Sequence, residues 1–232
     1  MCQEFWNWSW DELVAYDLPA VFDYVYTHTG QKINYVGHSL GTLIALASFS
    51  EGSQVDKLKS AALLSPIAYL SYMNTTLVVL AAKAFVGEVL LFGLAEFNPK
   101  GKPVSDFLKT LCTNPGVDCF DLLSELTVIR DRVVAKYNYG RPDYNLMHYG
   151  KFFPPMYNIS NIPHDLPLFI SYGGKDALSD VRDVQELLDS FKYHDGDKLS
   201  VQYIKDYAHA DFIMGIDAKD VVYNQVVALF NR

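Results

Sequence analysis

The chain has 232 residues, of which half are hydrophobic and one fifth are charged, a composition typical of globular proteins. Its length suits a single domain with room for an insertion. The net charge of −8 disfavours nucleic acid as a partner, because an acidic surface and a phosphate backbone repel each other.

Targeting and membrane signals are weak. The first residues lack a basic segment followed by an apolar run, so no signal peptide is predicted, and a cytoplasmic location is expected if Met1 is the true start. No uncharged apolar run of about 18 residues occurs, so no transmembrane span is predicted. The most apolar segment, 77–95, is interrupted by Lys83 and Glu88.

The first predicted element is a helix over residues 9–30. Ser9 and Glu12 have the spacing of a capping box, and Gly30 is a typical helix end. An apolar stripe of this helix is predicted to face the core, with the members Leu13, Tyr16, Ala20, Tyr24 and Val25.

Strand and helix patterns then alternate. Strand patterns occur at 33–37, 58–66, 166–174 and 198–206, and helical patterns follow at 42–50, 176–192 and 218–232. Such alternation predicts an α/β fold with a mostly parallel sheet and helices on both faces. The run 58–66 is almost continuously apolar, as in a strand buried on both faces.

The alternation stops between residues 67 and 166. This stretch is far longer than an ordinary connection and contains helical patterns at 77–95 and 120–137, which predicts an inserted helical cap. The predicted organisation is therefore a core formed by residues 1–66 and 167–232, interrupted by a cap at 67–166.

Two of the three cysteines, Cys112 and Cys119, flank an Asn-Pro-Gly turn within this cap. Their spacing is compatible with a short disulfide loop and equally with two free thiols.

The segment "GHSLG", Gly37 to Gly41, matches the pattern G-x-S-x-G and lies between a predicted strand and a predicted helix. In this context the serine occupies a strained turn, and the helix N-terminus offers free N–H groups to a developing oxyanion. Ser39 is therefore a candidate nucleophile and the Leu40 N–H a candidate oxyanion donor, whereas the alternative is a serine that serves only the turn.

A serine nucleophile needs a base that a carboxylate orients, in the chain order Ser, Asp or Glu, His. Asp176 comes directly after a strand and two glycines, where the carboxyl ends of parallel strands gather. Its nearest rival, Asp180, falls at the predicted helix start, and a role in a turn or cap is the alternative for either residue.

Six histidines compete for the base. Only His209 follows the last predicted strand, so His209 is the candidate. His38 adjoins Ser39 and is expected to point away from it, and His194 lies in a polar loop that suggests an exposed residue. His28 precedes the nucleophile, and two more histidines precede the acid in the insertion. No metal-binding motif or phosphate loop occurs in the sequence, so the predicted chemistry requires no cofactor or metal.

These residues resemble the eukaryotic acid lipase family, the group of gastric and lysosomal acid lipases, and most closely its plant triacylglycerol lipases. The segments that carry the resemblance are "FWNWSWDELVAYDLPA", "YVGHSLGT", "PLFISYGGKDALSDVRDV" and "YAHADFI". The resemblance implies an α/β-hydrolase fold, a triad of Ser39, Asp176 and His209, and a cap disulfide between Cys112 and Cys119. It also implies hydrolysis of triacylglycerols or sterol esters, often at acidic pH, in a secreted, vacuolar or lysosomal setting. The apolar helices predicted for the cap suit contact with a lipid interface.

The chain departs from this family in two ways. The family's domain begins with several earlier strands and an His-Gly loop that supplies a second oxyanion donor, and no His-Gly pair occurs here. The cap is also expected to be shorter than in the family. The chain therefore resembles a truncated lipase, with the strand at 33–37 as a sheet edge. The alternative function is a non-catalytic lipase-like protein that binds lipid or a partner; neither reading predicts an oligomeric state.

Overall fold

The computed structural model describes residues 8–69, 71–72, 133–139 and 141–232. The chain separates into two compact units, residues 9–73 with 129–232, and residues 1–8 with 74–128. The sheet and the candidate site belong to the first of these units. The predicted cap helix at 77–95 and the pair Cys112 and Cys119 lie outside the described residues.

The centre of the described fold is a four-stranded parallel sheet in the order β1-β2-β3-β4. Its strands are β1 (Ile33–Ser39), β2 (Leu58–Pro66), β3 (Leu168–Gly173) and β4 (Leu199–Ile204). The predicted parallel sheet is therefore confirmed. Among the described strands β1 is an edge, as the sequence predicted.

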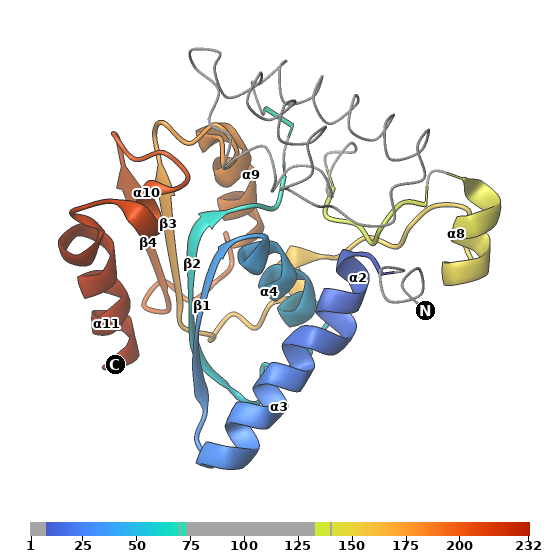
Figure 1. Ribbon diagram of the computed structural model, residues 1–232, viewed down its shortest axis with the longest axis horizontal. Coiled ribbons are helices and arrows are strands. Elements are labelled where there is room, and N and C mark those ends of the chain that lie inside the picture. Colours follow the sequence, from blue (N-terminus) through green and yellow to red (C-terminus); the bar gives the residue numbers. More distant parts are fainter. Residues whose placement is uncertain (1–7, 70, 73–132, 140) are drawn as a thin grey trace, which may run out of the picture. The chain divides into compact units, whose positions relative to one another are not determined.

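Helices cover both faces of this sheet. Figure 1 shows α3 (Leu18–Thr29) and α4 (Leu40–Ser50) on one side, and α11 (Asn224–Phe230) on the other. The remaining helical segments are α2 (Trp10–Glu12), the π-helix η1 (Leu13–Asp17), α8 (Pro142–Tyr149), the 3-10 helix η2 (Ile159–Asn161), α9 (Val181–Ser190), α10 (Asp211–Met214) and the π-helix η3 (Lys219–Tyr223).

The first helical region begins and ends as its sequence predicts. Ser9 and Glu12 form a capping box, and Gly30 ends α3 in the left-handed conformation at φ +64°. The predicted buried stripe is wrong, however, because Tyr16 and Tyr24 are 68% and 65% exposed. The buried stripe repeats every four residues instead, at Trp10, Val14, Leu18 and Phe22.

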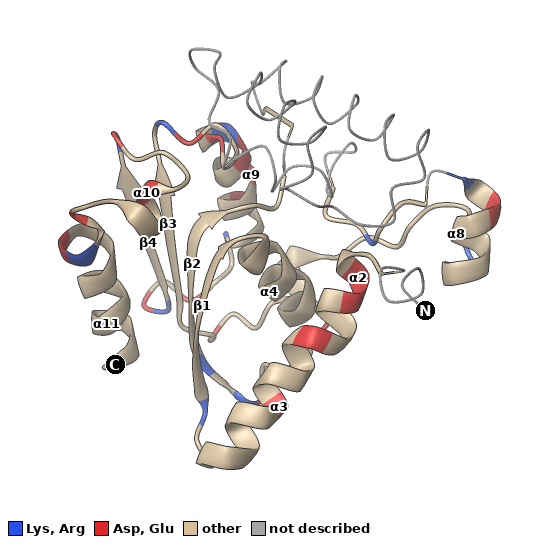
Figure 2. Cartoon of the chain, viewed as in Figure 1, with Lys and Arg blue, Asp and Glu red and all other residues tan. Residues whose placement is uncertain are grey.

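The helix α4 is buried almost all round. Its sequence "LGTLIALASFS" contains no charged residue, and Figure 2 shows it without red or blue segments. Small residues such as Ala45 and Ala47 let it pack closely on the sheet, and both are fully buried. This buried helix begins directly after the candidate nucleophile, Ser39.

The other face of the sheet packs against α11. Its buried cluster consists of Ala62, Leu64, Phe169, Tyr207, Phe212, Val222, Val226 and Leu229. The strand register places Val36 beside Ala62, and Ala62 beside Phe169, so these three residues form one row. Val36 is nevertheless 48% exposed, which shows that the helical cover weakens towards β1.

Residues 133–139, within the predicted cap, form a non-helical segment. The helix predicted for 120–137 does not include its last residues, because 133–137 are not helical and Ala135 forms an isolated antiparallel bridge with Met156. The Tyr137 N–H donates to Asp11 Oδ1 at 2.9 Å, which joins this segment to α2. Within the described residues no helix is long and apolar enough to cross a membrane.

Candidate active site

The candidate nucleophile lies at the junction of β1 and α4. Ser39 has φ +56° and ψ −124°, a region that non-glycine residues rarely occupy, and its side chain is 9% exposed. The Thr42 hydroxyl donates to the Ser39 carbonyl at 2.6 Å and supports the turn. The conformation is the strained strand-to-helix turn that the pattern G-x-S-x-G predicts.

Steric contacts explain why residue 37, two positions before Ser39, is a glycine. A Cβ on Gly37 would lie 3.0 Å from the carbonyl carbon and oxygen of Gly41, closer than side chains normally approach backbone. A Cβ on Gly41 would meet only the Tyr35 hydroxyl, at 3.4 Å. Gly37 is therefore required by the tight approach of β1 and α4, whereas Gly41 is less constrained.

The candidate acid follows β3 in a buried loop. Asp176 is 5% exposed, and its Oδ1 accepts the backbone N–H groups of Leu178 and Ser179 at 2.9 and 2.8 Å. Burial by itself raises the pKa of Asp176, but hydrogen bonds and the charge of His209, with further hydrogen bonds from Ser65 and Ser179, outweigh it and hold the pKa below 3.8. The carboxyl is therefore ionised at neutral pH. Its rival Asp180 is the N-cap of α9 and accepts from the Arg182 N–H.

Two glycines bring the acid loop against the loop of the candidate base. A Cβ on Gly173 would lie 2.1 Å from the Tyr207 carbonyl oxygen, and one on Gly174 would lie 2.4 Å from that of Lys205. The Lys175 N–H donates to the same Tyr207 carbonyl at 3.0 Å. Only glycine permits this approach, which sets the separation of the two loops.

Asp176 and His209 form a buried pair. The His209 Nδ1 lies 3.1 Å from Asp176 Oδ1 and 3.0 Å from Oδ2, and the His209 side chain is 4% exposed. A carboxylate can only accept, so Nδ1 carries the proton and donates it. In the neutral ring Nε2 is then unprotonated, which is the form that can remove a proton from a hydroxyl.

His38 connects the nucleophile turn to the base loop. Its Nε2–H donates to the His209 carbonyl oxygen at 2.9 Å, and the two rings lie 4.7 Å apart between centroids. The expectation that His38 points away from the site is therefore wrong. Burial lowers the pKa of His38, which keeps its ring neutral beside His209.

Two buried polar atoms of the candidate triad have no hydrogen-bond partner among the described residues. They are the Ser39 hydroxyl oxygen and His209 Nε2. Buried polar atoms are normally paired, so each unpaired one calls for an explanation. Here the two atoms are the ones that a proton transfer from serine to histidine would use.

The other histidines do not join this group. His194, expected at the surface, is 9% exposed, and its Nε2–H donates to the Leu166 carbonyl at 2.7 Å. That expectation is wrong because the "YHDGD" loop folds back onto the start of β3. His28 and His148 are instead engaged at Tyr24 and Tyr139, the former by a hydrogen bond and the latter by ring stacking.

The structure also reveals a residue that the sequence interpretation missed. Ser65, at the carboxyl end of β2, donates to Asp176 Oδ2 at 2.6 Å and is fully buried. A signal existed, because Ser65 is a polar residue at the end of an apolar strand. The parallel sheet brings that strand end to the same edge as Ser39 and Asp176.

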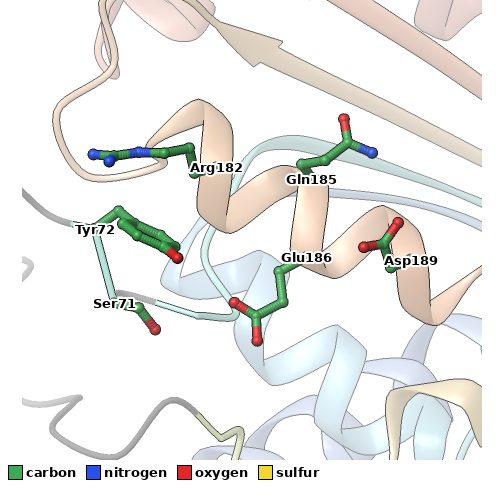
Figure 3. A pocket seen from close by; sticks show the side chains of 6 residues that line it. All are labelled: Ser71, Tyr72, Arg182, Gln185, Glu186 and Asp189. Carbon is green, nitrogen blue, oxygen red and sulfur yellow. The ribbon is translucent and has the colours of Figure 1, made fainter.

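A separate hollow of about 440 Å³ lies along α9 (Figure 3). It is lined by Ser71, Tyr72, Arg182, Gln185, Glu186 and Asp189, and none of the three triad candidates is among them. Arg182 lies over the Tyr72 ring, 4.3 Å from its centroid. Across the part of the chain that the structure describes, no cluster of His, Cys, Asp or Glu could hold a metal ion.

Known proteins match this chain over nearly its whole length. The sequence family described as alpha/beta hydrolase fold matches residues 6–215. Triacylglycerol lipase 2 of Arabidopsis thaliana is 54% identical over 98% of this chain and 62% of its own length. Human gastric triacylglycerol lipase is 30% identical over 99% of this chain and 65% of its own length. The expected resemblance to this group of lipases is confirmed, and the chain spans about two thirds or less of these relatives.

Solved structures agree on the fold. An esterase of Pyrococcus furiosus superposes with a TM-score of 0.54 at 17% identity, covering 96% of this chain and 62% of that one. An alpha/beta fold hydrolase of Bacillus anthracis gives 0.53 at 14% identity, covering 95% and 73%. With its parallel sheet, its strained serine turn and the match across residues 6–215, the chain belongs to the α/β-hydrolase fold family.

Proposed function

We propose that this chain is a serine ester hydrolase of the triacylglycerol-lipase type. The observation that carries the proposal is the buried pair of Asp176 and His209, whose Nε2 has no hydrogen-bond partner among the described residues. The strained strand-to-helix turn at Ser39 supports it. The names of the relatives, among them triacylglycerol lipases of plant and mammal, favour a lipid ester as substrate.

The proposed mechanism begins with attack by the Ser39 hydroxyl on the ester carbonyl carbon. His209 Nε2 takes the hydroxyl proton and later gives it to the departing alcohol. Asp176 holds the Nδ1–H, so that the ring keeps the correct tautomer and its positive form is stabilised. Water then attacks the acyl-enzyme and releases the fatty acid.

The oxyanion that forms in each step needs hydrogen-bond donors. The helix α4 begins at Leu40, so its first N–H groups have no partner within the helix. We assign the Leu40 N–H to this role. One donor of this kind is worth about 10²–10³ in turnover in a comparable site.

The lipid specificity is assigned to the segment 67–166. We propose that it forms a cap over an acyl pocket and meets a lipid interface. The relatives include gastric lipases. We therefore propose that this chain works in an acidic compartment, either secreted, vacuolar or lysosomal.

The test compares the full chain with its Ser39→Ala variant. Hydrolysis is measured with a short-chain nitrophenyl ester and with emulsions of a triacylglycerol and a sterol ester, at pH 5 and pH 7. We expect the variant to lose about 10⁴-fold or more of the ester activity, as removal of a triad serine does elsewhere. A fluorophosphonate should label the wild type by one adduct at Ser39 and leave the variant unlabelled.

Equal rates and no adduct in either protein would overturn the proposal. Retention of emulsion binding by both proteins would then support the alternative of a non-catalytic lipid-binding protein. A rate with the nitrophenyl ester but with neither emulsion would keep the hydrolase and remove the lipid specificity.

A further inference from the structure

Ser65 is a buried polar residue that the proposed mechanism does not use. It lies at the carboxyl end of β2, has no exposed surface, and adopts φ +48°. Its hydroxyl donates to Asp176 Oδ2 at 2.6 Å, across 111 residues of sequence. Hydrogen bonds from a hydroxyl to a carboxylate are among the shorter and stronger ones in proteins.

The partners of Asp176 show what this hydroxyl adds. Oδ1 is held by two backbone N–H groups of its own loop, those of Leu178 and Ser179. Oδ2 has no backbone donor among the described residues, and besides the shared His209 Nδ1 its partner is the Ser65 hydroxyl. Each carboxylate oxygen therefore accepts at least one hydrogen bond from a residue other than His209. Together these hydrogen bonds fix the plane of the carboxylate.

The neighbours of Ser65 extend the same connection. The Pro66 carbonyl accepts the Ser179 hydroxyl at 2.7 Å, from the acid loop. The Ile67 N–H donates at 2.8 Å to Thr42 Oγ1, which in turn donates to the Ser39 carbonyl. Three consecutive residues at the end of β2 thus contact both the acid loop and the nucleophile turn.

The backbone conformation is informative as well. A positive φ costs a residue with a Cβ about 1–2 kcal/mol, and glycine would avoid that cost. Ser65 occupies this conformation with its hydroxyl directed at a buried charge, so the strain and the hydrogen bond occur in one residue. Strain that persists beside a reactive group is a reason to look for a role.

We propose that Ser65 is a positioning residue that orients the Asp176 carboxylate towards His209 Nδ1. As regards catalysis, the proposal rests on the proposed hydrolase function. Without the hydroxyl, Oδ2 would lose a donor to its charged form. The more basic carboxylate would then stabilise the protonated His209 ring more strongly and hold it less firmly in place. Among the described residues, His38 is a titratable group that lies beside the pair, because its ring packs on that of His209.

The experiment uses two substitutions at one position. Ser65→Ala and Ser65→Gly both remove the hydroxyl, but only glycine also relieves the positive φ. Ser60→Ala is the matched control, because Ser60 is a buried serine of the same strand whose hydroxyl donates to Asn34, at the end of β2 away from the site. All variants are made in the full chain.

Two measurements are compared. The first is the proton NMR resonance of the His209 Nδ1–H, followed with pH, which requires no substrate. The second is the pH profile of kcat/KM, whose acid limb reports protonation of the free enzyme's base. We expect both Ser65 variants to shift the resonance, to move the acid limb upward by about half a pH unit or more, and to lower kcat/KM about 5- to 50-fold. Ser60→Ala should leave the resonance and the acid limb in place.

A wild-type resonance and acid limb in Ser65→Gly would overturn the proposal, because Ser65 would then matter only through its backbone. Equal shifts in Ser60→Ala would overturn it too, since any lost hydroxyl of β2 would have the same effect. A shifted resonance in both Ser65 variants of a chain that hydrolyses no ester would support the positioning role while the proposed function fails.

Discussion

β1 and β3 both end at the candidate site, but their surroundings differ along their length. β3 lies between β2 and β4, and all six of its residues are buried. β1 is an edge among the described strands, and burial increases along it, from the exposed Asn34 and Val36 to the buried Gly37 and Ser39. The end of β1 at the site is enclosed, whereas its beginning is open.

This difference shows where the site obtains its rigidity. The strand before Asp176 is buried between two neighbouring strands. Ser39 instead depends on local contacts at the end of β1, namely the hydrogen bond from the Thr42 hydroxyl and the packing of α4 on β1. The acid should therefore depend on the sheet, and the nucleophile on its turn. Three experiments test this difference between the two strands.

The largest effect is expected at the tip of β3, from Asp176→Asn. The amide cannot replace both carboxylate acceptors of the Nδ1–H, so His209 loses its preferred tautomer. Ester turnover should fall by about 10³–10⁴-fold, as in a triad that loses its acid. Turnover is measured beside a thermal melt of each protein. A fall of less than tenfold in a folded variant would mean that the contact of Asp176 with His209 is only structural.

The next prediction compares how much unfolding free energy a substitution costs in β3 and in β1. Ile170→Ala in β3 empties a fully buried position and should cost about 2–5 kcal/mol of unfolding free energy. Val36→Ala in β1 removes a side chain that is 48% exposed and should cost less than about 1 kcal/mol. Urea unfolding of the two variants measures both values. Similar losses would show that β1 is as firmly covered as β3 and would remove the distinction between them.

The smallest effect is a pH dependence of stability. The pKa of Asp176 is lowered in the folded chain. At any pH above the pKa that Asp176 has in the unfolded chain, its ionised form therefore stabilises the fold. That contribution is lost as the pH falls from about 4 through the lower folded-state pKa. Between pH 5 and pH 2 the wild type should therefore lose more unfolding free energy than Asp176→Asn. Parallel losses in denaturant unfolding at each pH would contradict the assignment.

Much of the fold could be predicted from local sequence. The strands at 58–66 and 166–174 were recognisable because buried parallel strands are continuously apolar, and they match β2 and β3 closely. The elbow at Ser39 and the positions of Asp176 and His209 after strands follow from the same alternation. In a parallel sheet, residues after strands meet at one edge, so their order along the chain is informative about the site.

Side-chain surroundings could not be predicted in this way. Apolar periodicity places the buried stripe of the first helix at Tyr16 and Tyr24, but α4 and β1 pack on the opposite face, that of Val14 and Phe22. The stripe was ambiguous because both faces of that helix carry large apolar residues. His38 and His194 were misplaced for a related reason, since their hydrogen-bond partners are carbonyl groups of residues 171 and 28 positions away.

Local sequence was sufficient to predict the four described strands and to nominate Ser39, Asp176 and His209 as candidates, because apolar periodicity, glycine placement and chain order are local properties. The partners that hold these side chains depend on the folded arrangement of the strands. The Ser65 hydroxyl reaches Asp176 across 111 residues, and no local pattern encodes a contact that exists only when two strand ends lie side by side.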